Sequence, residues 1–134
     1  MKYKLIDKPH FVSREVYTEV TNKLIDKLRP NKSIVSVYTI GHVGNPGISD
    51  IDMLIIAKDN CLLSENYRAE MSLQEKYLFL HQPIACSESG FSKAQIFSFF
   101  HNYNLVHGKD IRVNSDLNAN DINILKKQTA LEFL

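Results

Sequence analysis

The chain of 134 residues has no tryptophan, no long hydrophobic run and only two cysteines. Cys61 and Cys86 are too few for a disulfide framework, so we expect free thiols in a reducing compartment. The longest unbroken apolar stretch, Met53 to Ala57, is far too short to span a membrane, and the first residues lack the apolar run of a secretory leader. The sequence therefore excludes a disulfide-stapled miniprotein and predicts a cytoplasmic protein with no membrane partner.

A strong charge of either sign is also absent. The sequence has 16 Lys and Arg residues against 15 Asp and Glu residues, a formal net charge of +1. Such a balance gives no field that would attract nucleic acid. Hydrophobic residues make up 44% and charged residues 23% of the chain, which is typical of a globular protein. The length suits one domain with its own core, so we expect residues 1–134 to form a single domain.

Apolar spacing and turn residues predict alternating helices and strands. The order is a helix from about Pro9 to Leu28, strands over 33–40 and 51–57, a helix from Ser64 to Leu78, an edge or irregular strand within 78–86, a helix from Ser92 through Tyr103, and a last helix over about 120–134. The predicted fold is a small α/β (α+β) domain, with a short mixed β-sheet and helices packed mainly on one face. The last helix has no stop signal, so it is either truncated or packed against a partner.

The stretch between the two strongest strands carries the chemistry. Gly41 to Gly47 holds three glycines and one proline in seven residues, and such a loop can present backbone N–H groups to phosphates. Asp50 and Asp52 follow, and residues two apart on a strand point to the same side. Paired carboxylates repel each other unless a cation intervenes, and hard oxygen ligands suit Mg²⁺ or Mn²⁺. Either feature alone is common, because aspartates at the start of a strand often only cap it or face solvent. Together they predict a site for a nucleoside triphosphate with its metal.

Gly41, the loop, and Ser49-Asp50-Ile51-Asp52 entering the apolar strand resemble the signature of the nucleotidyltransferase superfamily with the DNA polymerase β-like fold. The segment Leu105 to Ile111 is similar to a later segment of adenylyltransferase-type members. The resemblance implies that Asp50 and Asp52 are catalytic and bind the metal. It also implies that nucleotide contacts come from the loop and its borders, at Gly41, His42, Gly44 and Ser49. The implied reaction transfers a nucleoside monophosphate to an acceptor hydroxyl, either on a small molecule or on a protein, and releases pyrophosphate.

Two departures from the family pattern keep an alternative open. His42 stands where the family usually has serine or glycine, and the stretch 79–86 contains no third carboxylate. Glu88 and Asp110 are candidates for that acid, or Gln82 occupies its place. The alternative is a catalytically inactive module that binds a nucleotide or a protein, such as an antitoxin-like partner of a toxin, or a homo-oligomer.

The spacing of the histidines and cysteines along the chain does not predict a second functional site. His81, His101 and His107 lack the spacing of a zinc site, so we expect structural or surface roles for them.

Overall fold

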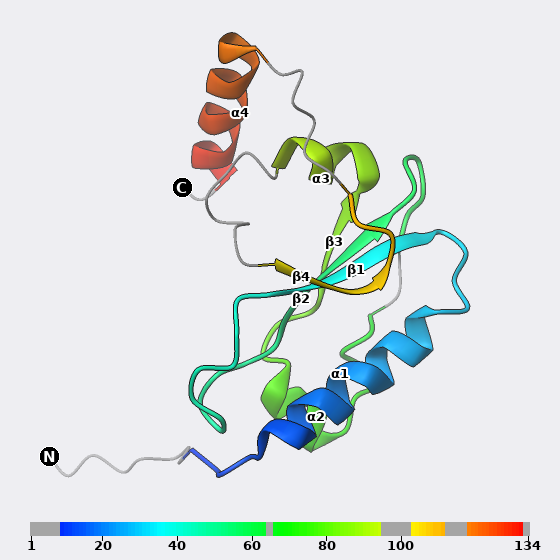
Figure 1. Ribbon diagram of the computed structural model, residues 1–134, viewed down its shortest axis with the longest axis vertical. Coiled ribbons are helices and arrows are strands. Elements are labelled where there is room, and N and C mark those ends of the chain that lie inside the picture. The colour runs from blue at the N-terminus through cyan, green and yellow to red at the C-terminus, as the bar shows by residue number, and fades with distance from the viewer. Residues whose placement is uncertain (1–8, 64–65, 95–102, 112–117, 133–134) are drawn as a thin grey trace, which may run out of the picture.

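The computed structural model describes residues 9–63, 66–94, 103–111 and 118–132 (Figure 1). Their elements are α1 (Arg14–Leu28), β1 (Ile34–Ile40), β2 (Asp52–Ala57), α2 (Leu73–Leu78), β3 (Ile84–Ser87), α3 (Glu88–Ala94), β4 (Tyr103–Gly108) and α4 (Ala119–Glu132). The described strands form one sheet in the order β3-β2-β1-β4. β1 pairs antiparallel with β2 and β4, whereas β2 pairs parallel with β3, so the sheet is mixed. The predicted α+β class with a short mixed sheet is confirmed.

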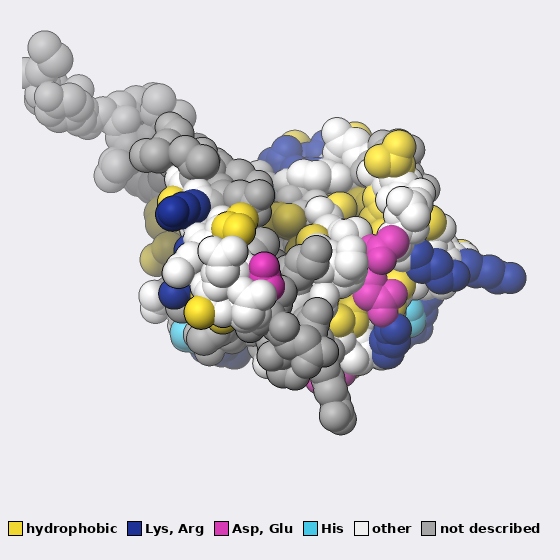
Figure 2. Space-filling view, turned by 90° about the horizontal axis from the view of Figure 1, so that it is seen from above, with side chains coloured by type: hydrophobic (Ala, Val, Ile, Leu, Met, Phe, Trp, Pro, Cys, Tyr) yellow, Lys and Arg dark blue, Asp and Glu magenta, His cyan; other side chains and the backbone are white. Residues whose placement is uncertain are grey.

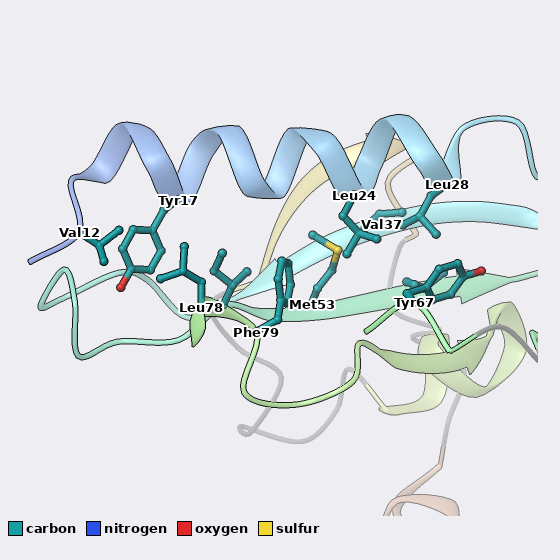
Figure 3. Close-up of a cluster of buried hydrophobic side chains, with 11 residues drawn as sticks. Val12, Tyr17, Leu24, Leu28, Val37, Met53, Tyr67, Leu78 and Phe79 are labelled. Atoms are coloured by element: carbon teal, nitrogen blue, oxygen red, sulfur yellow. The ribbon is translucent and has the colours of Figure 1, made fainter. Parts of the chain in front are cut away.

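Strand β2 is buried on both faces, as its continuous apolar sequence predicts. On one face, Met53 packs in a cluster with Leu24 and Leu28 of α1, which lies across the sheet (Figure 3). On the other face, Leu54 packs in a cluster with Phe91 of α3. Figure 1 accordingly shows α1 and α2 on one side of the sheet and the short α3 on the other. Each face of β2 is thus closed to water, and polar groups find room only at the ends of the strand.

Helix α1 begins at Arg14, five residues after the predicted start. Ser13 occupies the N-cap position in an extended conformation, and residues 9–13 have no helical assignment. The helix ends at Leu28, ahead of Pro30, where the sequence predicts its end.

The second helix is much shorter than predicted. Ser72 and Glu75 form a reciprocal capping box, in which the Ser72 hydroxyl accepts from the Glu75 N–H and the Glu75 carboxylate accepts from the Ser72 N–H. This box starts α2 at Leu73, while the predicted cap, Ser64, lies outside the described residues.

The later part of the chain differs most from the prediction. β3 begins directly after Pro83 and lies at an edge of the sheet, as that proline suggested. The helix expected from Ser92 begins at Glu88 instead, and Tyr103, expected within it, is the first residue of β4. Residues 95–102 of the expected helix lie outside the described part of the chain. α4 begins at Ala119, where the Asn118 side chain accepts hydrogen bonds from two following backbone N–H groups.

Charges of both signs lie side by side on the surface. On the face seen in Figure 2, acidic side chains form one larger cluster with Lys, Arg and hydrophobic side chains beside it, and smaller acidic patches lie apart from it. Across the described residues, no helix has the length and apolar character needed to cross a membrane.

The ion pair between Glu75 and Lys23 joins α2 to α1, with 2.6 Å between the charged atoms. The hydrogen bond from Lys23, followed by those within the capping box, lowers the pKa of Glu75 from 4.5 to about 2. Because the pKa is lower in the folded state, the stabilisation is complete above the unfolded value of 4.5 and is lost as the pH falls towards 2.

We expect Glu75→Gln, which keeps the shape of the cap, to lower the free energy of unfolding by up to about 1 kcal/mol at neutral pH. Urea denaturation across this range tests it, and a difference that does not shrink in acid would contradict it.

Candidate active site at the start of strand β2

Asp50 and Asp52 lie at the amino end of β2 and border the same cavity. Ile51 between them is only 7% exposed, and its N–H donates to the carbonyl of Leu78 at 2.7 Å. Asp50 and Asp52 both line an open cavity of about 340 Å³, together with Ile51 and residues of α1. The structure therefore brings the two carboxylates together as the sequence pattern indicates.

The two carboxylates influence each other electrostatically. Partial burial raises the pKa of Asp52, and the negative charge of Asp50 raises it further. The nearby His81 opposes both effects. Asp52 nevertheless keeps much of its side chain exposed at the cavity. This is a carboxylate in an environment that disfavours its negative charge yet leaves it open to a ligand.

Two tyrosine hydroxyls hold the glycine loop in place. Tyr17 of α1 donates to the carbonyl of Ser49 at 2.5 Å and accepts from the N–H of Gly47 at 2.9 Å. Tyr77 of α2 donates to the carbonyl of Gly47 at 2.5 Å and accepts from the N–H of His10 at 3.2 Å. The hydroxyls tie the backbone just before Asp50 to two helices. The sequence pattern does not single out either tyrosine as part of the site, although a buried tyrosine hydroxyl generally needs a partner.

The predicted nucleotide contacts fall into two groups. Gly41 and His42 line the cavity with the aspartates. Ser49 instead closes its own loop, because its hydroxyl accepts from the N–H of Asn45 at 3.0 Å and its N–H donates to the carbonyl of Asn45 at 2.8 Å. Gly44 lies beside Ser49 and His42 in the same loop. A nucleotide contact at Ser49 or Gly44 stays a prediction.

Uncharged polar side chains complete the cavity wall, which the sequence does not single out. They come from α1, β1 and β4: Thr18, Thr21, Asn22, Thr39 and Asn104.

The candidate third carboxylates lie at the other end of β2 from the aspartate pair. β2, β3 and β4 run in the same direction, so Glu88 and Asp110, which follow β3 and β4, gather at the carboxyl end of β2. Glu88 pairs with Lys109 at 2.5 Å, and Asp110 accepts a hydrogen bond from the Tyr38 hydroxyl at 3.1 Å. Six residues of β2, at about 3.3 Å each, put roughly 20 Å between these acids and the aspartate pair. Neither acid lies beside Asp50 and Asp52.

The region where the sequence places a missing acid contains His81 and Gln82. The Gln82 side chain accepts from the backbone N–H of Arg68 at 3.1 Å. His81 is near enough to lower the pKa of Asp52. Of the other histidines, His107 lies on β4 and His101 is outside the described residues. Within the described ranges, no three His, Cys, Asp or Glu side chains converge as a metal site would require.

Two carboxylates without a third match the way Mg²⁺ is commonly held in proteins. Mg²⁺ keeps several waters and takes one or two carboxylates, with substrate phosphates supplying further oxygens. Asp50 and Asp52 border an open cavity with room for such a ligand. The donor set fits a hard divalent cation that arrives with a phosphate-bearing substrate.

Comparison with known proteins gives one likeness. No protein-family model and no curated protein matches the chain. Among solved structures, it is similar to a chain of the rebuilt and re-refined structure of a tri-AMPylated Shewanella oneidensis HEPN toxin in complex with MNT antitoxin. The alignment covers 86% of this chain and 88% of that chain, at 16% sequence identity and a TM-score of 0.41. The likeness is one of fold alone, and it transfers no residue role.

Removing the charge of Asp50 is expected to change the titration of Asp52. In Asp50→Asn, the pKa of Asp52 should fall because the like charge is gone, yet stay above its ordinary value because burial, the larger cause, remains. Carboxyl-carbon NMR titration of both proteins measures it. Asp26→Asn on the exposed side of α1 is the control and should leave Asp52 unchanged. An unaltered pKa of Asp52 in Asp50→Asn would show that the two carboxylates do not interact.

Gly47 is expected to be the least replaceable glycine of the loop. It has a φ of +88°, and a Cβ there would lie 2.0 Å from the backbone oxygen of His10. Gly47→Ala should lower the free energy of unfolding by at least about 2 kcal/mol, since left-handed strain and the clash add. Gly44→Ala, where the nearest atom would be 3.6 Å away, should cost less than about 0.5 kcal/mol. Thermal denaturation of the two variants compares them, and equal melting temperatures would contradict the prediction.

Proposed function

We propose that this chain is a metal-dependent nucleotidyltransferase domain, which moves a nucleoside monophosphate from a nucleoside triphosphate to an acceptor hydroxyl. The observation that carries the proposal is the aspartate pair: Asp50 and Asp52 share one cavity, where burial, and then repulsion from the charge of Asp50, raises the pKa of Asp52. A divalent cation relieves that repulsion, and substrate phosphates complete its oxygen ligands. The glycine loop before the pair and the buried strand after it match the motif that the sequence resembles.

The reaction forms one bond to the α-phosphorus and breaks another. The acceptor oxygen bonds to the α-phosphorus while the bond from that phosphorus to the bridging oxygen breaks. Pyrophosphate leaves with the electron pair, and the hydroxyl proton is released to solvent. A cation held by Asp50 and Asp52 would neutralise charge on the transferred phosphoryl group and lower the pKa of the attacking hydroxyl.

The contribution of the protein is to hold the aspartate pair in position. The tyrosine hydroxyls fix the backbone that leads into Asp50, so the pair is positioned before any ligand arrives. At Gly41, a Cβ would meet nothing within 4 Å, which leaves open space beside the backbone. The threonine and asparagine side chains on the cavity wall offer hydroxyl and amide groups, which suit the uncharged sugar and base of a nucleotide.

A binding module without turnover is the second candidate. The observation that favours it is the lack of a third acid beside Asp50 and Asp52 among the described residues. Such a domain would hold nucleotide, or a protein partner, and release no pyrophosphate.

Nucleotide binding with metal separates these functions. We expect one of the four ribonucleoside triphosphates, with Mg²⁺ or Mn²⁺, to raise the melting temperature. The stabilisation should be about 2.7 kcal/mol at a hundred times the Kd. Asp50→Asn and Asp52→Asn should each abolish the metal-dependent part, and Asp26→Asn should not.

Turnover is measured as transfer of label from α-labelled triphosphate to components of a cell extract, together with pyrophosphate release. Loss of both in the aspartate variants supports the transferase. Binding without transfer favours the second candidate, and the absence of metal-dependent binding by the folded protein would refute the proposed function.

A further inference from the structure

A second cavity, of about 640 Å³, has His81 in its wall and shares no lining residue with the polar one. Its walls come from the turns around Arg68, from Lys76 of α2, and from His81 and Gln82, which lead into β3. Its charged lining is basic, since none of the described residues lining it is acidic.

The two cations of this cavity have no carboxylate partner in the described part of the chain. Among the described residues, the Arg68 guanidinium donates to two backbone carbonyls, through Nε to Phe79 at 2.8 Å and through Nη2 to Lys76 at 3.5 Å. Lys76 donates through Nζ to the carbonyl of Ala69 at 3.2 Å. The basic side chains that do form ion pairs with carboxylates lie elsewhere: Lys23, Lys27, Arg29 and Lys109. Two positive charges therefore line one cavity in which no carboxylate of the described residues neutralises them.

Arg68 is fixed in place before any ligand binds. The carbonyl that receives its Nε–H belongs to Phe79, which is fully buried, and its own N–H donates to the Gln82 side chain. A guanidinium has five N–H donors, and the bonds named above use two of them. The remaining donors form a fork of the kind that binds phosphate oxygens in pairs.

The cavity is connected to the aspartate pair through His81. His81 lines it, and the charge of His81 also acts on Asp52. The backbone also joins the two sites, because the N–H of Ile51, between the aspartates, donates to the carbonyl of Leu78, three residues before His81.

We propose that this cavity binds a phosphate-bearing anion, with Arg68 and Lys76 as its charged donors and His81 on its wall. The anion is the polyphosphate tail of the nucleotide or a phosphate group on the acceptor. Anion binding itself needs no transfer chemistry; only its assignment to one of these two substrates rests on the proposed function.

Calorimetric titration with inorganic triphosphate, without divalent metal, tests the site. We expect saturable binding that weakens with added salt. Lys76→Gln and Arg68→Gln should each weaken it about tenfold, the effect of losing one charged hydrogen bond. Lys32→Gln, an exposed lysine near the start of β1, should bind as the wild type does.

Arg68 also supports the Phe79 carbonyl, so Arg68→Lys serves as a second variant that keeps the charge and loses the fork. We expect its affinity to lie between those of the wild type and Arg68→Gln, with circular dichroism verifying that each variant is folded. Absence of saturable binding, or equal affinity in the folded wild type, Lys76→Gln and Arg68→Lys, would overturn the proposal.

Two further arms identify the source of the phosphate and keep this site distinct from the proposed function. Asp50→Asn/Asp52→Asn should bind triphosphate at least as well as the wild type, because two negative charges near the cavity are gone, whether or not the domain is a transferase. Loss of binding there would count against the cavity as the site. Competition between triphosphate and a bound nucleotide assigns the cavity to the nucleotide tail, whereas simultaneous binding assigns it to the acceptor, and both results support an anion site.

Discussion

The burial of β2 on both faces is the constraint on which the arrangement of charge depends. Met53 to Ala57 are covered by α1 on one side and α3 on the other, so no charge is tolerated along the strand. Carboxylates are confined to its two ends. Asp50 and Asp52 occupy the amino end, and Asp59 lies with Glu88 and Asp110 at the carboxyl end. The length of the strand separates these two acidic groups. Only the first borders the polar cavity in which the two aspartates act on each other.

Packing of the helices also determines the geometry of the candidate site. Tyr17 is 4% exposed within the cluster beneath α1, and its hydroxyl holds both Gly47 and Ser49 (Figure 3). The apolar part of the ring belongs to the core, while the hydroxyl at its tip belongs to the loop. Movement of α1 relative to the sheet would therefore be passed directly to Asp50. A loop rich in glycine is mobile in isolation, but this one is held by backbone hydrogen bonds that its lack of side chains makes accessible. Gly47 in particular allows this backbone to pack closely against His10.

The sequence predicts what local pattern encodes and misses what long-range pairing encodes. The first strand and β2 carry continuous β-branched and apolar runs, and both were predictable, as was the convergence of Asp50 and Asp52. β4 was not predicted, because its residues alternate little in burial and it exists through pairing with β1 across some seventy positions. The capping box at Ser72 was a readable local signal that Ser64 obscured. The position of Arg68 at a cavity could not be predicted from the sequence, because it depends on the fold that brings Phe79 and Gln82 beside it.

The near-zero net charge of the chain conceals a local division of charge around Asp52. The cavity beside α1 is lined by aspartates, hydroxyls and amides, and Lys and Arg are absent from its described lining. The cavity beside α2 has the opposite character, with two cations that no described carboxylate neutralises. A ligand that is polar but uncharged at one end and multiply anionic at the other would match the character of both cavities. Under the proposed function, such a ligand would bring a divalent cation to Asp50 and Asp52, and the cationic cavity would offset the remaining phosphate charge. The two cavities together, rather than the aspartate motif alone, would then select the substrate.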